Sequence, residues 1–102
     1  MDKLLLLEDD VSLIDGLTYS LGKQGYKVDV ARTVAEASAL LSDLTQYTML
    51  LLDVTLPDGT GFEICEQIRR RSKQIPIIFL TAYDEEVSII RRLASGGDDY
   101  KT

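Results

Sequence analysis

The run Met49-Leu50-Leu51-Leu52 stops abruptly at Asp53, and a second apolar run, Leu4-Leu5-Leu6-Leu7, leads into Glu8-Asp9-Asp10. Short apolar runs of this kind are typical of strands that are buried on both faces of a parallel sheet. The carboxyl ends of such strands lie along one edge, and ligand sites in open α/β sheets lie outside that edge. The sequence therefore predicts an α/β fold in which these acidic residues converge at one rim of the sheet.

The predicted acidic cluster, Glu8, Asp9 and Asp53, suggests a particular chemistry. Carboxylates that are gathered in one place repel one another unless a proton or a hard divalent cation neutralises them. Ligand sets made of oxygen atoms alone favour Mg²⁺, Mn²⁺ or Ca²⁺. An aspartate that also binds such a cation is a candidate phosphoryl acceptor. We expect the neighbouring Asp10 to act as a helix N-cap instead of a metal ligand.

The composition indicates one small globular domain that covers residues 1–102. Hydrophobic residues make up 45% of the chain and charged residues 27%. No apolar stretch reaches the roughly 18 to 20 residues that a membrane helix needs, and the N-terminus lacks a signal-peptide pattern. The single cysteine, Cys65, excludes an internal disulfide. These features together predict a cytoplasmic protein that does not associate with membranes.

Two further features of the composition exclude whole classes of function. The formal net charge of −6 argues against nucleic-acid binding by this segment, because phosphate backbones are bound mainly by cationic side chains. The chain also contains no histidine, which excludes Ser-His-Asp and Cys-His catalysis, histidine-ligated zinc and a phosphohistidine carrier. The chemistry that remains is that of carboxylates and hydroxyl groups.

Strands and helices are predicted to alternate along the chain, so that helical crossovers join parallel strands. Strands are expected at residues 3–8, 26–30, 48–53 and 76–81, with the start of a fifth at 98–102. Helices are expected over residues 11–23, 33–44 and 62–71, and again from Asp84. The first two show apolar stripes at helical spacing, formed by Val11, Ile14, Leu17 and Leu21 and by Val34, Ala37, Leu40, Leu41 and Leu44.

Local signals predict where these helices begin and end. Gly25 should close the first helix, and Thr33 with Glu36 should form a capping box at the start of the second. The run Arg69-Arg70-Arg71 should be a solvated helix end that the helix dipole favours. Between Asp53 and the third helix we expect a turn, since Pro57-Asp58-Gly59-Thr60-Gly61 combines a fixed φ with two permissive glycines.

Taken together, these motifs resemble the receiver domain of bacterial two-component response regulators, in particular the type that precedes a winged-helix DNA-binding domain. The resemblance covers essentially all of the chain. It is carried by Leu-Leu-Leu-Glu8-Asp9-Asp10, Leu-Leu-Asp53-Val-Thr-Leu-Pro57-Asp-Gly59-Thr-Gly61, Ile-Phe-Leu-Thr81-Ala82 and Gly97-Asp-Asp-Tyr100. Each motif alone is weak, but their order and spacing are specific. The resemblance implies a flavodoxin-like, doubly wound parallel sheet with strand order 2-1-3-4-5.

The resemblance also implies a role for the acidic residues. Asp53 resembles the phosphoacceptor that takes a phosphoryl group from the phosphohistidine of a sensor histidine kinase. Asp9 and Asp53 would bind Mg²⁺, or Mn²⁺, directly, whereas Glu8 would act through a water molecule. The main-chain carbonyl of Thr55 would fill a further position. The cation would neutralise charge on the transferring phosphoryl group.

Two residues near the C-terminus resemble the switch of the family. Thr81 would hydrogen-bond the phosphoryl group, and its movement would be coupled to inward rotation of Tyr100. The implied output is transcription, through a DNA-binding domain that is not in this chain. A receiver-receiver dimer is implied for the full-length protein.

The chain departs from the family pattern at its C-terminal end. A Lys-Pro pair follows the fifth strand in the family, and alignment through Asp98-Asp99-Tyr100 places it just beyond Thr102; Lys101 is one position out of register. The last helix of the family also has no counterpart. We therefore expect a truncated receiver, with a shortened last strand, whose uncovered apolar surface lowers stability or promotes self-association.

Two alternative functions remain open at this point. A phosphatase of the haloacid-dehalogenase type also places a nucleophilic aspartate after an apolar strand, but it needs a second aspartate where this chain has Thr55. A receiver-like interaction module that is never phosphorylated is the other alternative, since the family's lysine is missing. For the receiver reading we expect no enzymatic activity beyond self-phosphorylation and dephosphorylation at Asp53.

Overall fold

The computed structural model describes residues 2–80, which form a parallel sheet with helices on both faces. Its elements in chain order are β1 (Lys3–Leu7), α1 (Val11–Lys23), β2 (Lys27–Ala31), α2 (Val34–Leu40), the 3₁₀ helix η1 (Leu44–Gln46), β3 (Met49–Asp53), β4 (Thr55–Leu56), β5 (Gly59–Thr60), α3 (Gly61–Arg69) and β6 (Ile77–Leu80). None of the described helices is long and apolar enough to cross a membrane.

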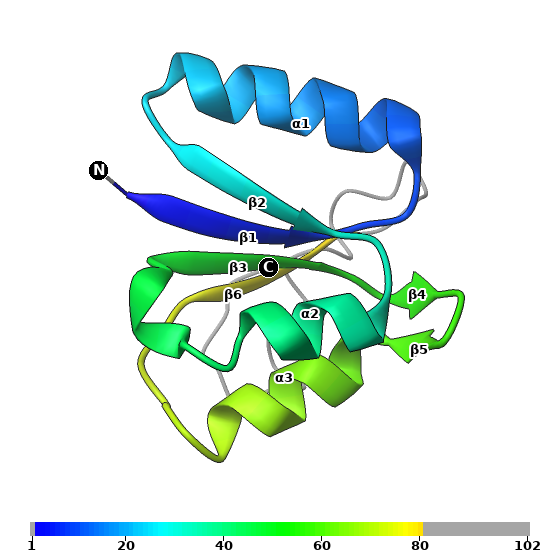
Figure 1. Ribbon diagram of the computed structural model, residues 1–102, viewed down its shortest axis with the longest axis vertical. Coiled ribbons are helices and arrows are strands. Elements are labelled where there is room, and N and C mark those ends of the chain that lie inside the picture. The colour runs from blue at the N-terminus through cyan, green and yellow to red at the C-terminus, as the bar shows by residue number, and fades with distance from the viewer. Residues whose placement is uncertain (1, 81–102) are drawn as a thin grey trace, which may run out of the picture.

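The strand order of the main sheet is β2-β1-β3-β6, and its three strand pairs are parallel. Because β6 is the fourth of the strands expected from the sequence, this order confirms the predicted 2-1-3-4 arrangement. The predicted fifth strand and the helix predicted from Asp84 lie outside the described residues. A short antiparallel hairpin, β4–β5, follows β3 at the carboxyl-end rim of the sheet (Figure 1).

The apolar runs are buried because both faces of the sheet are covered. Figure 1 shows α1 on one face and α2 with α3 on the other. Successive side chains of a strand point to opposite faces. In β1, Leu5 and Leu7 therefore pack in the core beneath α2 and α3, whereas Leu4 and Leu6 pack against the α1 side. This two-sided burial is the physical reason that the runs show no alternation of polar and apolar residues.

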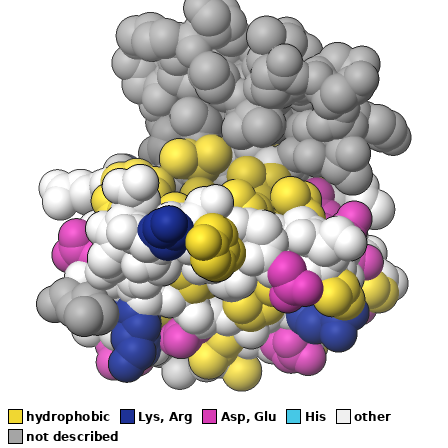
Figure 2. All heavy atoms as spheres, turned by 90° about the horizontal axis from the view of Figure 1, so that it is seen from above, with side chains coloured by type: hydrophobic (Ala, Val, Ile, Leu, Met, Phe, Trp, Pro, Cys, Tyr) yellow, Lys and Arg dark blue, Asp and Glu magenta, His cyan; other side chains and the backbone are white. Residues whose placement is uncertain are grey.

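The predicted ends of the first helix are confirmed. Asp10 is the N-cap of α1, and its Oδ1 accepts hydrogen bonds from the main-chain N–H groups of Ser12 and Leu13 at 2.9 and 3.2 Å. Gly25 follows the C-cap with φ of +95°, a left-handed conformation that favours glycine. Viewed from the α1 side, hydrophobic side chains of the surface lie among charged ones (Figure 2).

The second helix is shorter than expected, since α2 ends at Leu40 instead of Leu44. The guanidinium of Arg71 donates to the carbonyls of Leu41 and Ser42 at 2.7 and 3.1 Å, so that the end of the helix receives its hydrogen bonds from another element. Leu44 still packs against the core, but from η1. The apolar stripe was therefore correct, and the helix length was wrong.

Two details of the predicted helix ends also need correction. Thr33 caps α2 as expected, but the Glu36 carboxylate accepts from the N–H of Arg32 at 2.8 Å instead of returning to Thr33. The arginine run is not simply solvated. Arg69 donates to the carbonyls of Ser72 and Ile75, and Arg71 holds the end of α2 as described above.

Candidate functional site

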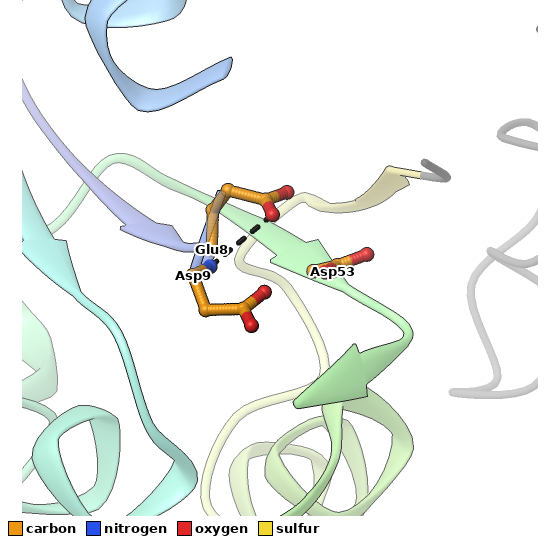
Figure 3. Close-up of side chains that lie close together, drawn as sticks. All are labelled: Glu8, Asp9 and Asp53. Carbon is orange, nitrogen blue, oxygen red and sulfur yellow. Dashed lines mark hydrogen bonds between the residues drawn. The ribbon is translucent and has the colours of Figure 1, made fainter. Parts of the chain in front are cut away.

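The acidic cluster is assembled by two adjacent strands. Glu8 and Asp9 directly follow β1, and Asp53 is the last residue of β3. These strands are paired with Leu7 opposite Leu52, so their carboxyl ends lie side by side. Each of the three side chains places a carboxylate oxygen within 4.8 Å of the others. Figure 3 shows the three side chains at the ends of these two strands.

Burial makes this arrangement unlike an ordinary acidic surface. Glu8 and Asp53 expose only 1% and 5% of their surface. Glu8 Oε2 accepts hydrogen bonds from the N–H groups of Asp9 and Asp10 at 3.1 and 3.0 Å, while Asp53 Oδ1 accepts from the N–H of Val54 at 2.8 Å. Glu8 Oε1 is buried and receives no hydrogen bond from a donor of the described chain. A buried oxygen without a main-chain donor is available to a proton or a cation.

The electrostatics of the site follow from this burial. Removal from water raises the pKa of Glu8 to about 7, and the negative charges of Asp53 and Asp9 act in the same direction. Burial also raises the pKa of Asp53, against hydrogen bonds that favour its ionised form. Without another positive charge at the site, Glu8 therefore takes up a proton at a higher pH than an exposed glutamate does.

These residues fit a hard divalent cation. The donor set consists of carboxylate oxygens alone, it carries excess negative charge, and one buried oxygen lacks a partner in the described chain. Glu8, Asp9 and Asp53 could hold such an ion. Thr55 begins β4 two residues after Asp53, and its carbonyl as a ligand stays a prediction.

Two predicted site residues, Thr81 and Tyr100, lie outside the described residues. The strand that precedes Thr81, β6, lies next to β3, and its last residue, Leu80, is opposite Asp53 in the register of the sheet. Leu80, the last described residue, therefore lies at the carboxyl-end rim of the sheet, next to Asp53.

Gly61, the first residue of α3, lies so close to β3 that a side chain has no room there. A Cβ atom at this position would run into the main-chain carbonyl of Asp53, and the N–H of Gly61 donates to the carbonyl of Val54 at 3.0 Å. Gly61 is not among the described glycines with positive φ. The prediction that it provides an unusual backbone conformation was therefore wrong, since close packing against the acceptor residue is what requires glycine here.

Sequence reasoning missed Arg32, which adjoins the acidic cluster. Its guanidinium donates to the main-chain carbonyl of Asp9 at 3.2 Å across 23 residues. Together with Asp9, Thr33, Glu36 and Pro57 it lines a hollow of about 320 Å³. No local pattern signals this contact, because it depends on how β2 pairs with β1.

Residues 4–102 match the family model of the response regulator receiver domain. The chain belongs to this family. The flavodoxin-like fold that the resemblance implied is therefore confirmed.

The receiver domain is similar to a part of several curated regulators. It is 41% identical over 100 residues to the transcriptional regulatory protein AfsQ1 of Streptomyces coelicolor, covering 98% of this chain and 44% of that protein. It is 35% identical over 100 residues to the alkaline phosphatase synthesis transcriptional regulatory protein PhoP of Bacillus subtilis, covering 98% of this chain and 41% of that protein. The chain thus spans less than half of the length of these relatives.

Solved structures show the same fold. The receiver domain of HemR from Leptospira biflexa, in its non-phosphorylated form, superposes with a TM-score of 0.80 at 34% identity, covering 94% of this chain and 77% of that one. The response regulator TrrA from Thermotoga maritima, solved in complex with Mg²⁺ and BeF, has a TM-score of 0.79 at 30% identity. That match covers 100% of this receiver domain and 88% of TrrA.

Proposed function

We propose that Asp53 accepts a phosphoryl group from the phosphohistidine of a sensor histidine kinase in a Mg²⁺-dependent reaction. The observation that carries the proposal is the acidic cluster, in which Asp53 and Glu8 are buried beside Asp9 within 4.8 Å at the rim of a receiver fold. The related protein TrrA was solved in complex with Mg²⁺ and BeF, which supports a Mg²⁺-dependent reaction at this kind of site.

The chain's own residues prepare the acceptor. Val54 holds Oδ1 of Asp53 through its N–H at 2.8 Å, which orients the carboxylate at the rim. An oxygen of Asp53 forms the new O–P bond as the N–P bond of the phosphohistidine breaks, and the imidazole keeps the electron pair and takes up a proton from solvent. Glu8, Asp9 and Asp53 would hold the cation, which when bound neutralises charge on the transferring group.

The consequences for signalling are part of the same proposal. The phosphorylated receiver switches a transcriptional output, through a DNA-binding domain outside this chain, as the named regulators among its relatives suggest. Thr81 and Tyr100 act in the switch, a receiver-receiver dimer forms in the full-length protein, and the kinase meets the receiver in the cytoplasm. The chain catalyses no reaction other than its own phosphorylation and dephosphorylation.

The test is the intact mass of the purified chain after incubation with Mg²⁺ and acetyl phosphate. We expect one added phosphoryl group that hydroxylamine removes, because an acyl phosphate is labile to this nucleophile. The group should be absent when Mg²⁺ is chelated and in Asp53→Asn, a matched control that keeps the size of the side chain. A folded wild-type chain that gains no phosphoryl group would favour a receiver-like interaction module instead.

A further inference from the structure

Asp58 joins two parts of the receiver that are far apart in the sequence. It lies in the turn between β4 and β5, yet its Oδ1 accepts from the N–H of Val34 at 2.7 Å and its Oδ2 from the N–H of Ala35 at 3.1 Å. Thr33 Oγ1 accepts from the N–H of Glu36 at 3.1 Å. The first three N–H groups of α2 are thus satisfied by two caps, one local and one supplied by the hairpin.

The hairpin that carries Asp58 is also the loop that follows the acceptor. At its base, the N–H of Gly61 donates to the carbonyl of Val54 at 3.0 Å, and Gly61 packs on the main chain of Asp53. Thr55 is paired with Thr60 across the hairpin. Asp58 adds a pair of hydrogen bonds at the tip, so the loop is fastened at both its base and its tip.

The start of α2 is in turn connected to the other half of the acidic cluster. Arg32 precedes the Thr33 cap, donates from its guanidinium to the carbonyl of Asp9 at 3.2 Å, and donates from its N–H to Glu36 at 2.8 Å. Pro57, next to Asp58, lines the same hollow as Asp9. The chain at the start of α2 is therefore bonded both to the segment of Asp9 and to the hairpin that follows Asp53.

We propose that Asp58 is a positioning residue of the phosphoacceptor site, which fastens the loop after Asp53 to the start of α2 and so fixes the spacing between that loop and the Asp9 segment. That these hydrogen bonds serve a phosphoacceptor site rests on the function proposed above, whereas the hydrogen bonds themselves do not. The hydrogen bonds from Val34 and Ala35 lower the pKa of Asp58, which is consistent with an ionised cap at neutral pH.

The test compares two variants that each remove one cap of α2. Asp58→Ala removes the cap that comes from the hairpin, and Thr33→Ala removes the local cap and leaves the hairpin untouched. In the metal-free protein, the hydrogen-exchange rate of the Gly61 N–H is measured by NMR. Mg²⁺ affinity is measured by calorimetry. Asp58→Asn, which keeps one acceptor oxygen, serves as the conservative variant.

We expect Asp58→Ala to accelerate exchange of the Gly61 N–H and to weaken Mg²⁺ binding about tenfold, as removal of an outer partner of a metal site commonly does. Asp58→Asn should lie between Asp58→Ala and the wild type in both measurements. Thr33→Ala should change neither measurement, although it weakens the same helix.

Equal changes in the two alanine variants would overturn the proposal, because the effect would then come from fraying of α2. Wild-type behaviour of Asp58→Ala would overturn it as well. Failure of the wild type to bind Mg²⁺ would instead count against the function proposed above. In that case, selective acceleration of Gly61 exchange in Asp58→Ala would still support the fastening role.

Discussion

At the scale of single residues, Glu8 and Asp53 are buried carboxylates placed side by side. Their burial works against ionisation, and the hydrogen bonds from main-chain N–H groups compensate only part of this cost. Glu8 is held by the N–H groups of Asp9 and Asp10, so it cannot turn outward without losing them. The site is therefore built to take up positive charge, as either a proton or a cation.

The raised pKa of Glu8 predicts how stability depends on pH. The ordinary value is 4.5 and the folded value about 7, so between these values the metal-free folded chain holds a proton that the unfolded chain has released. The contribution of Glu8 to stability is thus fully present below pH 4.5 and is lost as the pH rises through about 7. Urea unfolding at a series of pH values, without metal, should show this loss.

The control for this prediction is Glu8→Gln, which cannot ionise. Because other groups titrate as well, the quantity to follow is the difference in the free energy of unfolding between the wild type and the variant. This difference should move in favour of Glu8→Gln as the pH rises through about 7. A difference that stays constant between pH 4.5 and about 7 would contradict the raised pKa of Glu8.

At the scale of elements, α1 is less deeply buried than α2 and α3, which each have at least one buried residue. It has no fully buried residue, and Val11 and Tyr19 expose 53% and 68% of their surface. Ile14, Leu17 and Leu21 are partly buried against the sheet, as the predicted apolar stripe requires. The stripe therefore directs the helix to the sheet, although Val11, which was predicted to belong to it, is mostly exposed.

Glycine in the middle of α1 predicts a stabilising substitution. No atom of the described chain lies within 4 Å of a Cβ built at Gly16, so Gly16→Ala adds a methyl group without a clash. We expect the free energy of unfolding to rise by about 0.5 to 1 kcal/mol, because alanine loses less backbone entropy in a helix. Urea unfolding monitored by circular dichroism provides the measurement.

Gly61→Ala is the matched control, since the same change is made where space is absent. The new methyl group would meet the carbonyl of Asp53, so this variant should be less stable than the wild type. If both glycine variants changed stability in the same direction, packing around Gly61 would not be the reason for glycine there.

At the scale of the whole molecule, the sheet divides the described part of the chain into two apolar layers. The larger layer lies beneath α2 and α3, where Phe79 of β6 is fully buried and its ring lies 4.9 Å from that of Phe62, measured between centroids. The smaller layer lies beneath α1 and contains Leu4, Leu6 and Leu51. Most of the fully buried side chains thus belong to the layer on the side of α2 and α3.

This division predicts that Phe79→Ala is severely destabilising. Removal of a buried phenyl ring costs about 3 to 5 kcal/mol through lost burial and the cavity that remains. That is a large part of the roughly 5 to 15 kcal/mol that stabilises a typical domain. Thermal unfolding should show a strongly lowered midpoint, or no cooperative transition at all.

Tyr19→Ala provides the comparison for this prediction. Tyr19 is also aromatic, but it exposes 68% of its surface, so its removal should change stability by no more than about 0.5 kcal/mol. Comparable losses in the two variants would mean that α1 contributes to the core more than its burial indicates.

Much of the fold and part of the site follow from the sequence alone. The runs that end at Glu8 and Asp53 predicted buried parallel strands, because continuous apolar residues are stable only where both faces of a strand are covered. The N-cap Asp10 and the left-handed Gly25 were correct, since each acts on N–H groups or dihedral angles within a few residues. The meeting of Glu8, Asp9 and Asp53 was correct because parallel strands bring their carboxyl ends to one rim.

Only the tertiary structure decided the features that depend on distant partners. Arg71 reaches the end of α2 across 30 residues, and Asp58 reaches its start across 24. The lack of room for a side chain at Gly61 arises only once α3 packs on β3. The pKa of Glu8 rises only once folding removes water from around its carboxylate. Local patterns determine which elements form, whereas hydrogen bonds and burial between elements are determined by their packing, which no single stretch of sequence contains.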